Sequence, residues 1–304
     1  MTTPESAYVA RTLVILNPAA GQVPAERTRR LLGGAFAVRG AAFDLVETAG
    51  AGDAARLARE AVARGYRAVA AAGGDGTVAE VISGLAGSST PLGIIPQGTA
   101  NQLAFNLGVP SELERAVAVV VHGTPGAVDV GQLADGRYFA LMAGAGWDAQ
   151  VVSAATREQK DRWGFGAYLY AGLRSALALP SARFRITADG QGFEVHAATV
   201  LVANVGSLLS GLIPTPLQIA PDASFRDGLL DVCVFAPRSL GDVTALLWKL
   251  ARRRYAADRR MLYLQAREVR VESEPPLATQ LDGDPAGLTP LVARAVPGGV
   301  RVLL

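Results

Sequence analysis

The sequence has little of the chemistry that builds disulfides, histidine metal sites or strongly charged surfaces. Of its 304 residues, one is cysteine, Cys233, and two are histidines, His122 and His196. A single thiol excludes an internal disulfide and any zinc or iron–sulfur site made of several cysteines. Two histidines leave little material for a histidine metal site or a catalytic triad. The 29 Lys+Arg against 27 Asp+Glu give a net charge of +2, which argues against a protein that coats nucleic acid.

A signal peptide and a membrane span are also missing from the pattern. The N-terminus carries an acid and no apolar run before Leu13, unlike a secretory signal. Residues 197–221 have no charge and are long enough for a bilayer, but Asn204 and two prolines would leave backbone groups unsatisfied in lipid. We therefore expect a buried strand over 198–204, an apolar loop after it, and a cytoplasmic protein.

What the chain does have is apolar residues, which make up 50% of it. At about 150 residues per domain, its length predicts two domains with buried cores. From residue 12 to 121, short apolar runs alternate with helical stretches, which predicts βαβ units and a parallel sheet. After Pro125 strand-like pieces dominate. We expect an α/β domain over 1–126 and a β-rich domain over 127–304, with the last strand as a candidate to return to the first domain.

The same patterns predict the individual elements. In the first domain we expect strands at 12–16, 43–47, 68–72 and 92–95. Helices are expected at 25–38, 53–64, 78–85 and 111–122, with Asp53 and Ser111 as N-caps. In the second domain we expect helices at 163–178 and 240–255 and strands at 127–133, 138–143, 183–188, 193–201, 229–235, 268–272 and 300–303.

The strongest motif is Gly73-Gly74-Asp75-Gly76-Thr77, placed where a strand is expected to end and a helix to begin. At the carboxyl edge of a parallel sheet, glycines let the backbone approach a ligand, and the helix N-terminus favours negative charge. This pattern predicts a phosphate site. A carboxylate there needs a cation, a water or a sugar hydroxyl beside the phosphate, so Asp75 indicates a magnesium nucleotide. The structural alternative is a glycine-rich turn in which Asp75 only caps the next helix.

Three further loops follow neighbouring strands: residues 17–21, Glu47-Thr48 and residues 97–101. Because the carboxyl ends of parallel strands meet at one edge, these loops can line a single crevice. Each alone is a weak signal, since Asn17 could be a turn residue and Thr99 a helix cap. No Walker A sequence occurs in the chain, so the phosphate site has to be built differently.

In combination these motifs resemble the diacylglycerol kinase catalytic-domain family, the soluble lipid kinases that include bacterial enzymes and sphingosine kinases. The resemblance continues in the family's order through residues 80–85 and 107–110. In the second half it includes residues 128–131, 144–146, 164–168, 227–231 and 282–284. It therefore runs through most of the chain.

The resemblance implies a nucleotide domain of NAD kinase and diacylglycerol kinase type, a β-sandwich-like domain, and Mg²⁺-dependent transfer of the ATP γ-phosphate to a lipid hydroxyl between them. The lipid would be diacylglycerol-like or sphingosine-like. It places ATP on Asn17, Thr48, Gly73, Gly74, Asp75, Gly76, Thr77, Val78, Ala79, Thr99 and Asn101. It assigns Asp75 and Asp129 to the catalytic Mg²⁺ network, and Asp227 with the carbonyls of Ser224 and Leu229 to a structural Mg²⁺. A simple Asp-Gly turn is the equal alternative for Asp227.

The general base is assigned to Asp284, the third residue of Asp282-Gly283-Asp284, because a lipid alcohol is a poor nucleophile until a group accepts its proton. The alternative is that residues 282–285 only form a turn. The family usually has Glu at the place of Asp284, so this carboxylate is one methylene shorter. Its bacterial diacylglycerol kinases usually have Asp at the place of Gln102, so one carboxylate of the metal network is missing. Because of these two differences from the family's usual residues, the sequence does not identify the acceptor lipid.

A lipid kinase has to reach its acceptor at a membrane. Residues 246–261 carry Lys249 and five arginines among apolar residues such as Trp248, which is typical of a basic amphipathic surface. Contact with an anionic membrane is one explanation of this segment, and a solvated arginine-rich helix face is the other and is slightly favoured. For the protein we expect a cytoplasmic location with transient peripheral contact at the inner face of the membrane. The apolar stretch 208–216 is a second candidate for contact with an acyl chain, or is buried packing. A homodimer stays open, and nucleic acid is not expected as a partner.

Two other functions compete with the lipid kinase. NAD kinases also use Gly-Gly-Asp-Gly in a nucleotide crevice, although residues 98–110 and 227–231 favour the lipid enzyme. A catalytically weak lipid-binding or regulatory protein of the same fold is the second, and Gln102 and Asp284 keep it open.

Overall fold

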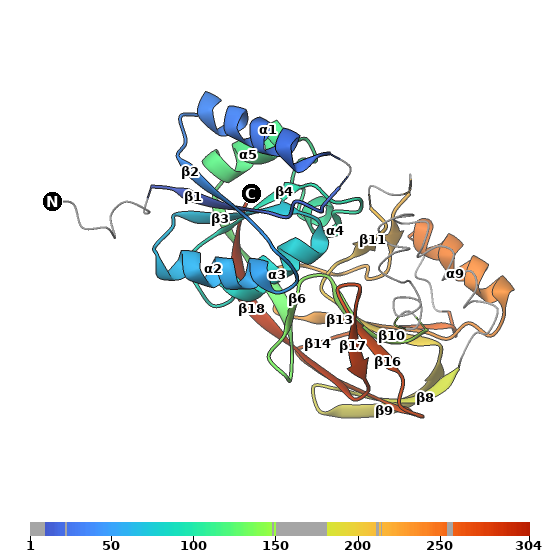
Figure 1. The fold of residues 1–304 in the computed structure, drawn as a ribbon. Helices are drawn as coiled ribbons and strands as arrows, with labels where there is room; N and C mark the ends of the chain where they lie inside the picture. The colour runs from blue at the N-terminus through green and yellow to red at the C-terminus, as the bar shows by residue number, and fades with distance from the viewer. Residues whose placement is uncertain are drawn as a thin grey trace. The chain divides into compact units, whose positions relative to one another are not determined.

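The structure, a computed structural model, describes residues 10–21, 23–147, 149, 181–210, 213, 215–253 and 258–304 (Figure 1). The chain forms two compact units, one of Met1–Asp129 with Pro297–Leu304 and one of Val130–Val296. Strands β5 (Pro125–Leu133) and β18 (Leu291–Leu303) contribute residues to both units. The helix predicted at 163–178 and the family pattern at 164–168 lie outside the described residues.

A parallel sheet forms the centre of the first unit, with strand order β2-β1-β3-β4-β18. Its strands are the end of β18 with β1 (Thr12–Leu16), β2 (Phe43–Glu47), β3 (Ala68–Gly73) and β4 (Leu92–Pro96). Because helices cover both faces, β1, β3 and β4 are buried over their whole length and consist almost entirely of apolar residues. The last strand joins this sheet through the parallel pairing of Val302 with Leu92.

The helices of the first unit are α1 (Ala25–Val38), α2 (Asp53–Ala63), α3 (Asp75–Leu85), α4 (Gln102–Asn106) and α5 (Leu113–His122). Figure 1 shows α1 and α5 together on one face of the sheet and α2 and α3 together on the other. The predicted N-caps are wrong: α2 has Gly52 at this position, and α5 begins after Glu112. The helix predicted at 78–85 begins earlier, at Asp75.

Two antiparallel sheets build the second unit. One has the order β14-β13-β10-β7-β16-β17, and the other contains β15, β8 and β9 beside the first part of β18, with β6 on β5. Apolar residues of both sheets, such as Phe184 and Val232, form one core between them. The strands are β6 (Tyr138–Phe139), β7 (Met142–Gly146), β8 (Ala182–Ala188), β9 (Gln191–Ala197), β10 (Thr199–Ala203), β13 (Leu230–Phe235), β14 (Met261–Ala266), β15 (Glu268–Glu274), β16 (Ala278–Leu281) and β17 (Asp284–Leu288). The predicted fold class, α/β followed by a β-sandwich-like domain, is confirmed.

The uncharged stretch 197–221 holds the strand predicted at 198–204, but the loop predicted after it includes a short hairpin. It contains β10 and the short hairpin of β11 (Ser207–Leu208) and β12 (Leu217–Gln218). The strand predicted at 193–201 is divided at Ala198, because β9 and β10 pair in different sheets. Helix α9 (Leu240–Ala251) begins at the N-cap Ser239, whose side chain accepts the Asp242 N–H at 3.1 Å. Among the described residues, no helix is long and apolar enough to cross a membrane.

Candidate functional site

The loops that follow β1, β3 and β4 lie side by side at the carboxyl edge of the parallel sheet. The Asn17 N–H donates to the carbonyl oxygen of Ala72 at 2.9 Å, and the Gln97 N–H donates to that of Gly73 at 2.9 Å. The side-chain amide of Asn17 also donates to Thr77 Oγ1 at 3.1 Å. The structure therefore brings together the three loops in which the sequence places the phosphates of a nucleotide.

Glycines allow these loops to pack backbone against backbone. A Cβ at Gly98 would lie 2.6 Å from the Cα of Gly74, and a Cβ at Gly21 would lie 2.1 Å from the carbonyl oxygen of Gln97. Gly21 in addition has a φ of +75°, which disfavours any side chain. No side chain can be added at either position without moving the neighbouring loop.

The packing predicts that Gly98→Ala lowers the free energy of unfolding. We expect a loss of about 1–3 kcal/mol, because the added methyl group forces the loops apart. Gly34→Ala is the matched control, since nothing lies within 4 Å of a Cβ at this position of α1, and it should be neutral or stabilising. Urea denaturation measures both. Equal stability of Gly98→Ala and the wild type would contradict the close contact of the loops.

Asp75 is the first residue of α3, and its carboxylate receives hydrogen bonds from the beginning of α4. Oδ1 accepts the Leu103 N–H at 3.1 Å. Burial raises the pKa of Asp75, whereas hydrogen bonds from the backbone of Gln102, Leu103 and Asn101 act in the opposite direction. The carboxylate thus stands at the N-termini of two helices and caps α4, not the helix that it begins.

Asn101 closes the loop between β4 and α4. Its backbone is left-handed, with a φ of 46°. The side chain accepts the Gly98 N–H at 2.9 Å and donates to the Gly98 carbonyl oxygen at 2.7 Å. Gln102 is buried and donates to the Ala100 carbonyl oxygen at 3.2 Å, whereas Thr99 is exposed. Asn101 and Gln102 therefore shape this loop, and Thr99 is accessible to a ligand.

Glu80 is a residue of this region whose role sequence reasoning missed. From α3, its carboxylate accepts the Gly52 N–H at 2.8 Å and the Ala54 N–H at 3.0 Å. These bonds cap α2 and fix the loop after Thr48, whose own N–H donates to the carbonyl oxygen of Leu16 at 2.9 Å. The only feature of the sequence that indicated a role for Glu80 was its position in the family pattern at 80–85.

Asp129 lies at the end of the first unit's long segment and is 4% exposed. Its Oδ1 accepts the Gly298 N–H at 2.7 Å, so it joins β5 to β18. The structure gives this carboxylate a structural contact, and its assignment to a metal network stays a prediction.

The turn before Asp284 is fixed by Asp282 in the second unit. The Asp282 carboxylate accepts the backbone N–H groups of Ala140 at 2.8 Å and of Leu141 and Met142 at 2.9 Å. These bonds divide the strand predicted at 138–143 into β6 and β7. Asp284 itself begins β17 and is exposed, so its carboxylate is accessible to an acceptor.

Gln280 holds the same turn from the other side. It is fully buried, and its Oε1 accepts the Gly283 N–H at 2.9 Å. The backbone before Asp284 is therefore anchored by the fully buried Gln280 and the half-buried Asp282, which gives the carboxylate a defined position.

The residues assigned to the structural Mg²⁺ form two local turns. Asp227 Oδ1 accepts the Leu229 N–H at 3.0 Å, and Ser224 Oγ accepts the Arg226 N–H at 3.1 Å. Within the described part of the chain, no three His, Cys, Asp or Glu side chains are grouped as a metal site would require. The turn that the sequence left as the alternative is present, and the metal assignment stays a prediction.

Asp231, on β13, is a buried carboxylate close to this turn. It is 1% exposed and accepts hydrogen bonds from the hydroxyl of Tyr263 and, at 3.2 Å, from the side-chain amide of Gln265. Burial, with smaller contributions from Asp227 and Asp222, raises the pKa of Asp231 to about 6.

Asp231→Asn should change the pH dependence of stability. The charged carboxylate destabilises the folded protein above pH 6, and this penalty disappears as the pH falls from about 6 to 3.8, because the folded state binds a proton first. The variant should therefore be more stable than the wild type at about pH 8, by at most about 3 kcal/mol, and the difference should vanish near about pH 4. Urea denaturation with EDTA present at each pH measures it. A difference independent of pH would contradict this assignment.

An apolar pocket of about 180 Å³ lies beneath α9. Its described lining includes Leu201, Phe235, Val243, Leu246 and Leu250, and its single hydroxyl side chain belongs to Thr199. The pocket offers hydrocarbon contacts of the kind that an acyl chain makes.

The basic segment 246–261 is partly neutralised by acids. Asp258 pairs with Lys249 at 2.5 Å and with Arg260 at 2.9 Å. The outer side of α9 instead exposes 51% of Trp248, with the Arg252 guanidinium 5.5 Å from its ring centre. The segment is therefore not one continuous cationic face, and its residues 254–257 lie outside the described structure.

The chain is similar to known proteins along most of its length. Residues 11–133 match the diacylglycerol kinase catalytic domain, and residues 142–304 match the YegS C-terminal NAD kinase beta sandwich-like domain. A diacylglycerol kinase from Bacillus subtilis (strain 168) is 30% identical over 92% of this chain and 91% of that protein. A Chromohalobacter salexigens protein named "Probable lipid kinase YegS-like" is 35% identical over 95% of this chain and 91% of that protein.

Solved structures agree with this relationship. The crystal structure of a diacylglycerol kinase from Bacillus anthracis str. Sterne has a TM-score of 0.74 to this chain at 25% identity, covering 97% of this chain and 96% of that one. The two matched domains and these relatives show that the chain belongs to the diacylglycerol kinase catalytic-domain family of lipid kinases and is a phosphotransferase with an alcohol group as acceptor.

Proposed function

We propose that the protein transfers the γ-phosphate of Mg-ATP to the hydroxyl of a diacylglycerol-like or sphingosine-like lipid, in phospholipid metabolism. The observation that carries this proposal is the packing of loops 17–21, 73–77 and 97–101 on one edge of a parallel sheet in a chain of this family. The carboxyl edge of such a sheet is where nucleotides bind. ATP would lie on the loop residues that the sequence assigns, with Thr99 accessible and Asn17 linked to Thr77.

A divalent cation fits the chemistry of Asp75. Burial disfavours the charge of this carboxylate, and a hard cation prefers carboxylate oxygens, so a nearby cation stabilises the ionised form. When bound, Mg²⁺ neutralises charge on the transferred phosphoryl group. Asp75 would hold it together with Asp129, and a second, structural ion would bind at Asp227, Ser224 and Leu229.

Asp284 would act as the general base. The lipid hydroxyl oxygen forms the new bond to the γ-phosphorus, the bond to the β–γ bridging oxygen breaks, and the hydroxyl proton passes to the Asp284 carboxylate. The anchored turn supports this role, because a base has to be held within hydrogen-bond reach of the proton that it accepts.

The acceptor would be reached by a cytoplasmic protein that contacts the membrane transiently. The apolar pocket beneath α9 is our candidate for an acyl chain. Exposed Trp248 with the cation of Arg252 on the outer side of α9 supports contact with the membrane interface. A homodimer stays a prediction that oligomeric-state measurements would test.

Transfer of radiolabelled phosphate from ATP with Mg²⁺ tests the reaction. The acceptors are diacylglycerol, monoacylglycerol, phosphatidylglycerol, sphingosine and ceramide in mixed micelles, with NAD as the comparison. A labelled lipid is the expected product and identifies the acceptor. Labelled NADP would show an NAD kinase instead. Binding of ATP without transfer to any acceptor would favour a catalytically weak lipid-binding or regulatory protein.

A further inference from the structure

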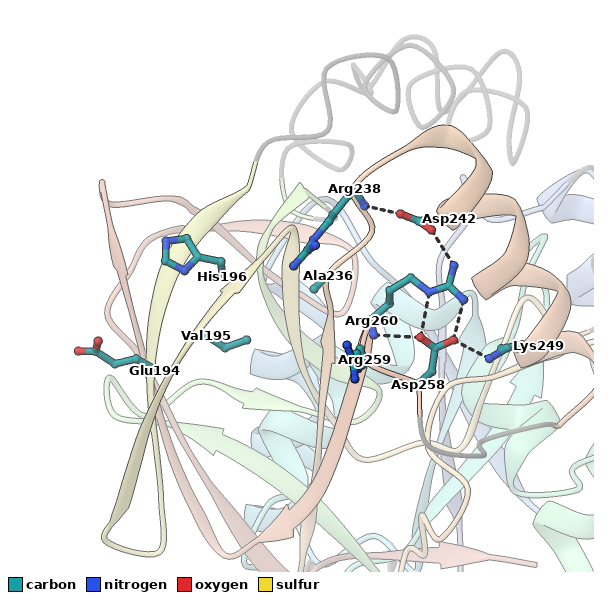
Figure 2. A pocket seen from close by; sticks show the side chains of 10 residues that line it. All are labelled: Glu194, Val195, His196, Ala236, Arg238, Asp242, Lys249, Asp258, Arg259 and Arg260. Atoms are coloured by element: carbon teal, nitrogen blue, oxygen red, sulfur yellow. Dashed lines mark hydrogen bonds and ion pairs between the residues drawn. The ribbon is translucent and has the colours of Figure 1, made fainter.

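A cavity of about 890 Å³ lies in the second unit, between β9 and the region around α9. Figure 2 shows the side chains that line it, which come from β9, from the segment leading into α9, from α9 itself and from residues 258–260 before β14. Most of these side chains are charged. The proposed nucleotide loops belong to the first unit, so the cavity is a different site.

The acidic groups on the α9 side of the cavity are fully engaged. Asp258 accepts hydrogen bonds from Lys249 Nζ at 2.5 Å and from Arg260 Nε and Nη2 at 2.9 Å. Asp242 accepts from Arg260 Nη1 at 2.6 Å and from the Arg238 N–H at 2.9 Å. The Asp258 side chain is 7% exposed, and these partners hold its pKa well below the usual range. The charges of Asp242 and Asp258 are therefore neutralised by those of Lys249 and Arg260 in one hydrogen-bonded network.

Arg238 and Arg259 line the cavity, but their guanidinium groups take no part in this network. Neither guanidinium forms an ion pair with a carboxylate of the described residues, and both side chains are exposed. Their backbones are nevertheless held, because Asp242 binds the Arg238 N–H and Arg259 lies between the two paired residues Asp258 and Arg260. In Figure 2 the Arg238 side chain extends away from Asp242 toward the β9 side of the cavity.

The β9 wall does not neutralise these two charges. Its acid, Glu194, is already paired with Arg183 at 2.5 Å and with Arg185 at 2.9 Å. His196 on the same strand adds an imidazole that can donate or accept a hydrogen bond. The cavity therefore has an excess of positive charge, carried by two guanidinium groups on an ordered frame.

We propose that this cavity binds a phosphate-bearing anion through Arg238 and Arg259. The planar fork of a guanidinium matches the oxygens of phosphate in a bidentate contact, and two such groups match the charge of a phosphomonoester. The volume is larger than inorganic phosphate needs, so the cavity can accommodate the organic group of a phosphate ester. The headgroup of an anionic lipid and a soluble phosphate ester share this chemistry.

Binding of phosphate esters to Arg238→Ala/Arg259→Ala tests the proposal in two arms. One arm measures cosedimentation with phosphatidylcholine vesicles that contain or lack phosphatidic acid, and the other measures binding of glycerol 3-phosphate by calorimetry. The wild type should bind phosphate in at least one arm, and the double variant should bind at least about 10-fold more weakly. Arg30→Ala/Arg59→Ala removes the same charge from α1 and α2 and should bind like the wild type.

The arms identify the source of the phosphate. Binding to vesicles with phosphatidic acid assigns a lipid headgroup, and binding of glycerol 3-phosphate alone assigns a soluble ester. The proposal is overturned if the wild type binds in neither arm or if the double variant binds as tightly as the wild type. Arg238→Lys/Arg259→Lys keeps the charge without the fork and should bind with intermediate affinity. Phosphoryl transfer from ATP to an acceptor in uncharged micelles should be unchanged in the double variant, so this test is independent of the proposed kinase activity.

Discussion

Asp75→Asn is expected to lower the rate of phosphoryl transfer by at least about 100-fold while the protein stays folded. Asparagine keeps an oxygen that can accept the Leu103 N–H, which Asp75 Oδ1 accepts at 3.1 Å. It removes the negative charge, which burial disfavours and which a bound cation would stabilise. The turnover number with saturating Mg-ATP and the thermal unfolding curve together measure the effect.

Asp75→Ala separates the two roles of this carboxylate. Alanine removes both the charge and the acceptor that caps α4, and loss of a cap costs about 1 kcal/mol. We therefore expect Asp75→Ala to lose as much transfer as Asp75→Asn and to be less stable by about this amount. Equal stability of the two variants would show that the cap contributes nothing.

Asp53→Asn provides the matched control, because Asp53 begins α2 as Asp75 begins α3. It should transfer phosphate at the wild-type rate. If Asp75→Asn also kept the wild-type rate, the role of Asp75 in a metal network would be refuted, and the capping of α4 would be its whole function.

The sequence predicts the first unit well because hydrophobic periodicity is a local property. The strands β1 and β2 and the helix α1 have the predicted bounds. The N-cap predicted for α2 was wrong because the group that caps this helix, the carboxylate of Glu80, belongs to another helix, α3. Asp75 of α3 caps α4 in the same way. Helix α4 was missed because five residues carry too little periodicity.

In the second unit, tertiary pairing decides what the sequence pattern leaves open. No glycine, proline or asparagine interrupts the strand-like pattern around Ala198, yet β9 and β10 belong to different sheets. The basic character of 246–261 was overestimated for a related reason. Asp258 lies within this segment, and Asp242 lies near the start of α9. Both carboxylates form ion pairs with Arg260 and neutralise part of the positive charge.

The parts of the candidate site that follow from the order of the strands could be predicted from the sequence. The parts that depend on the contacts of a single side chain could not. Loops after parallel strands had to share an edge, so their meeting follows from the strand order. The anchoring of the Asp284 turn by the carboxylate of Asp282 does not follow from any spacing, because its partners are backbone groups more than a hundred residues away.

Asp284→Asn is expected to lower the turnover number by about 100- to 10,000-fold and to leave the Kd for ATP unchanged. A general base acts in the transition state, so its loss appears in turnover and not in nucleotide binding. The side chain is exposed at the start of β17, so the replacement costs no core packing. Steady-state kinetics and direct nucleotide binding test the two parts separately.

Asp284→Glu examines the shorter carboxylate of this chain. Glutamate is the family's usual residue, and a displacement of the carboxylate by one methylene changes the rate by at most about 100-fold if it still reaches the hydroxyl. A parallel loss of ATP affinity and turnover in Asp284→Asn would make Asp284 a binding residue, and unchanged turnover would reduce residues 282–285 to a turn. Because Asp282 and Gln280 anchor the backbone in all of these variants, the differences in rate report the position and charge of the carboxylate itself.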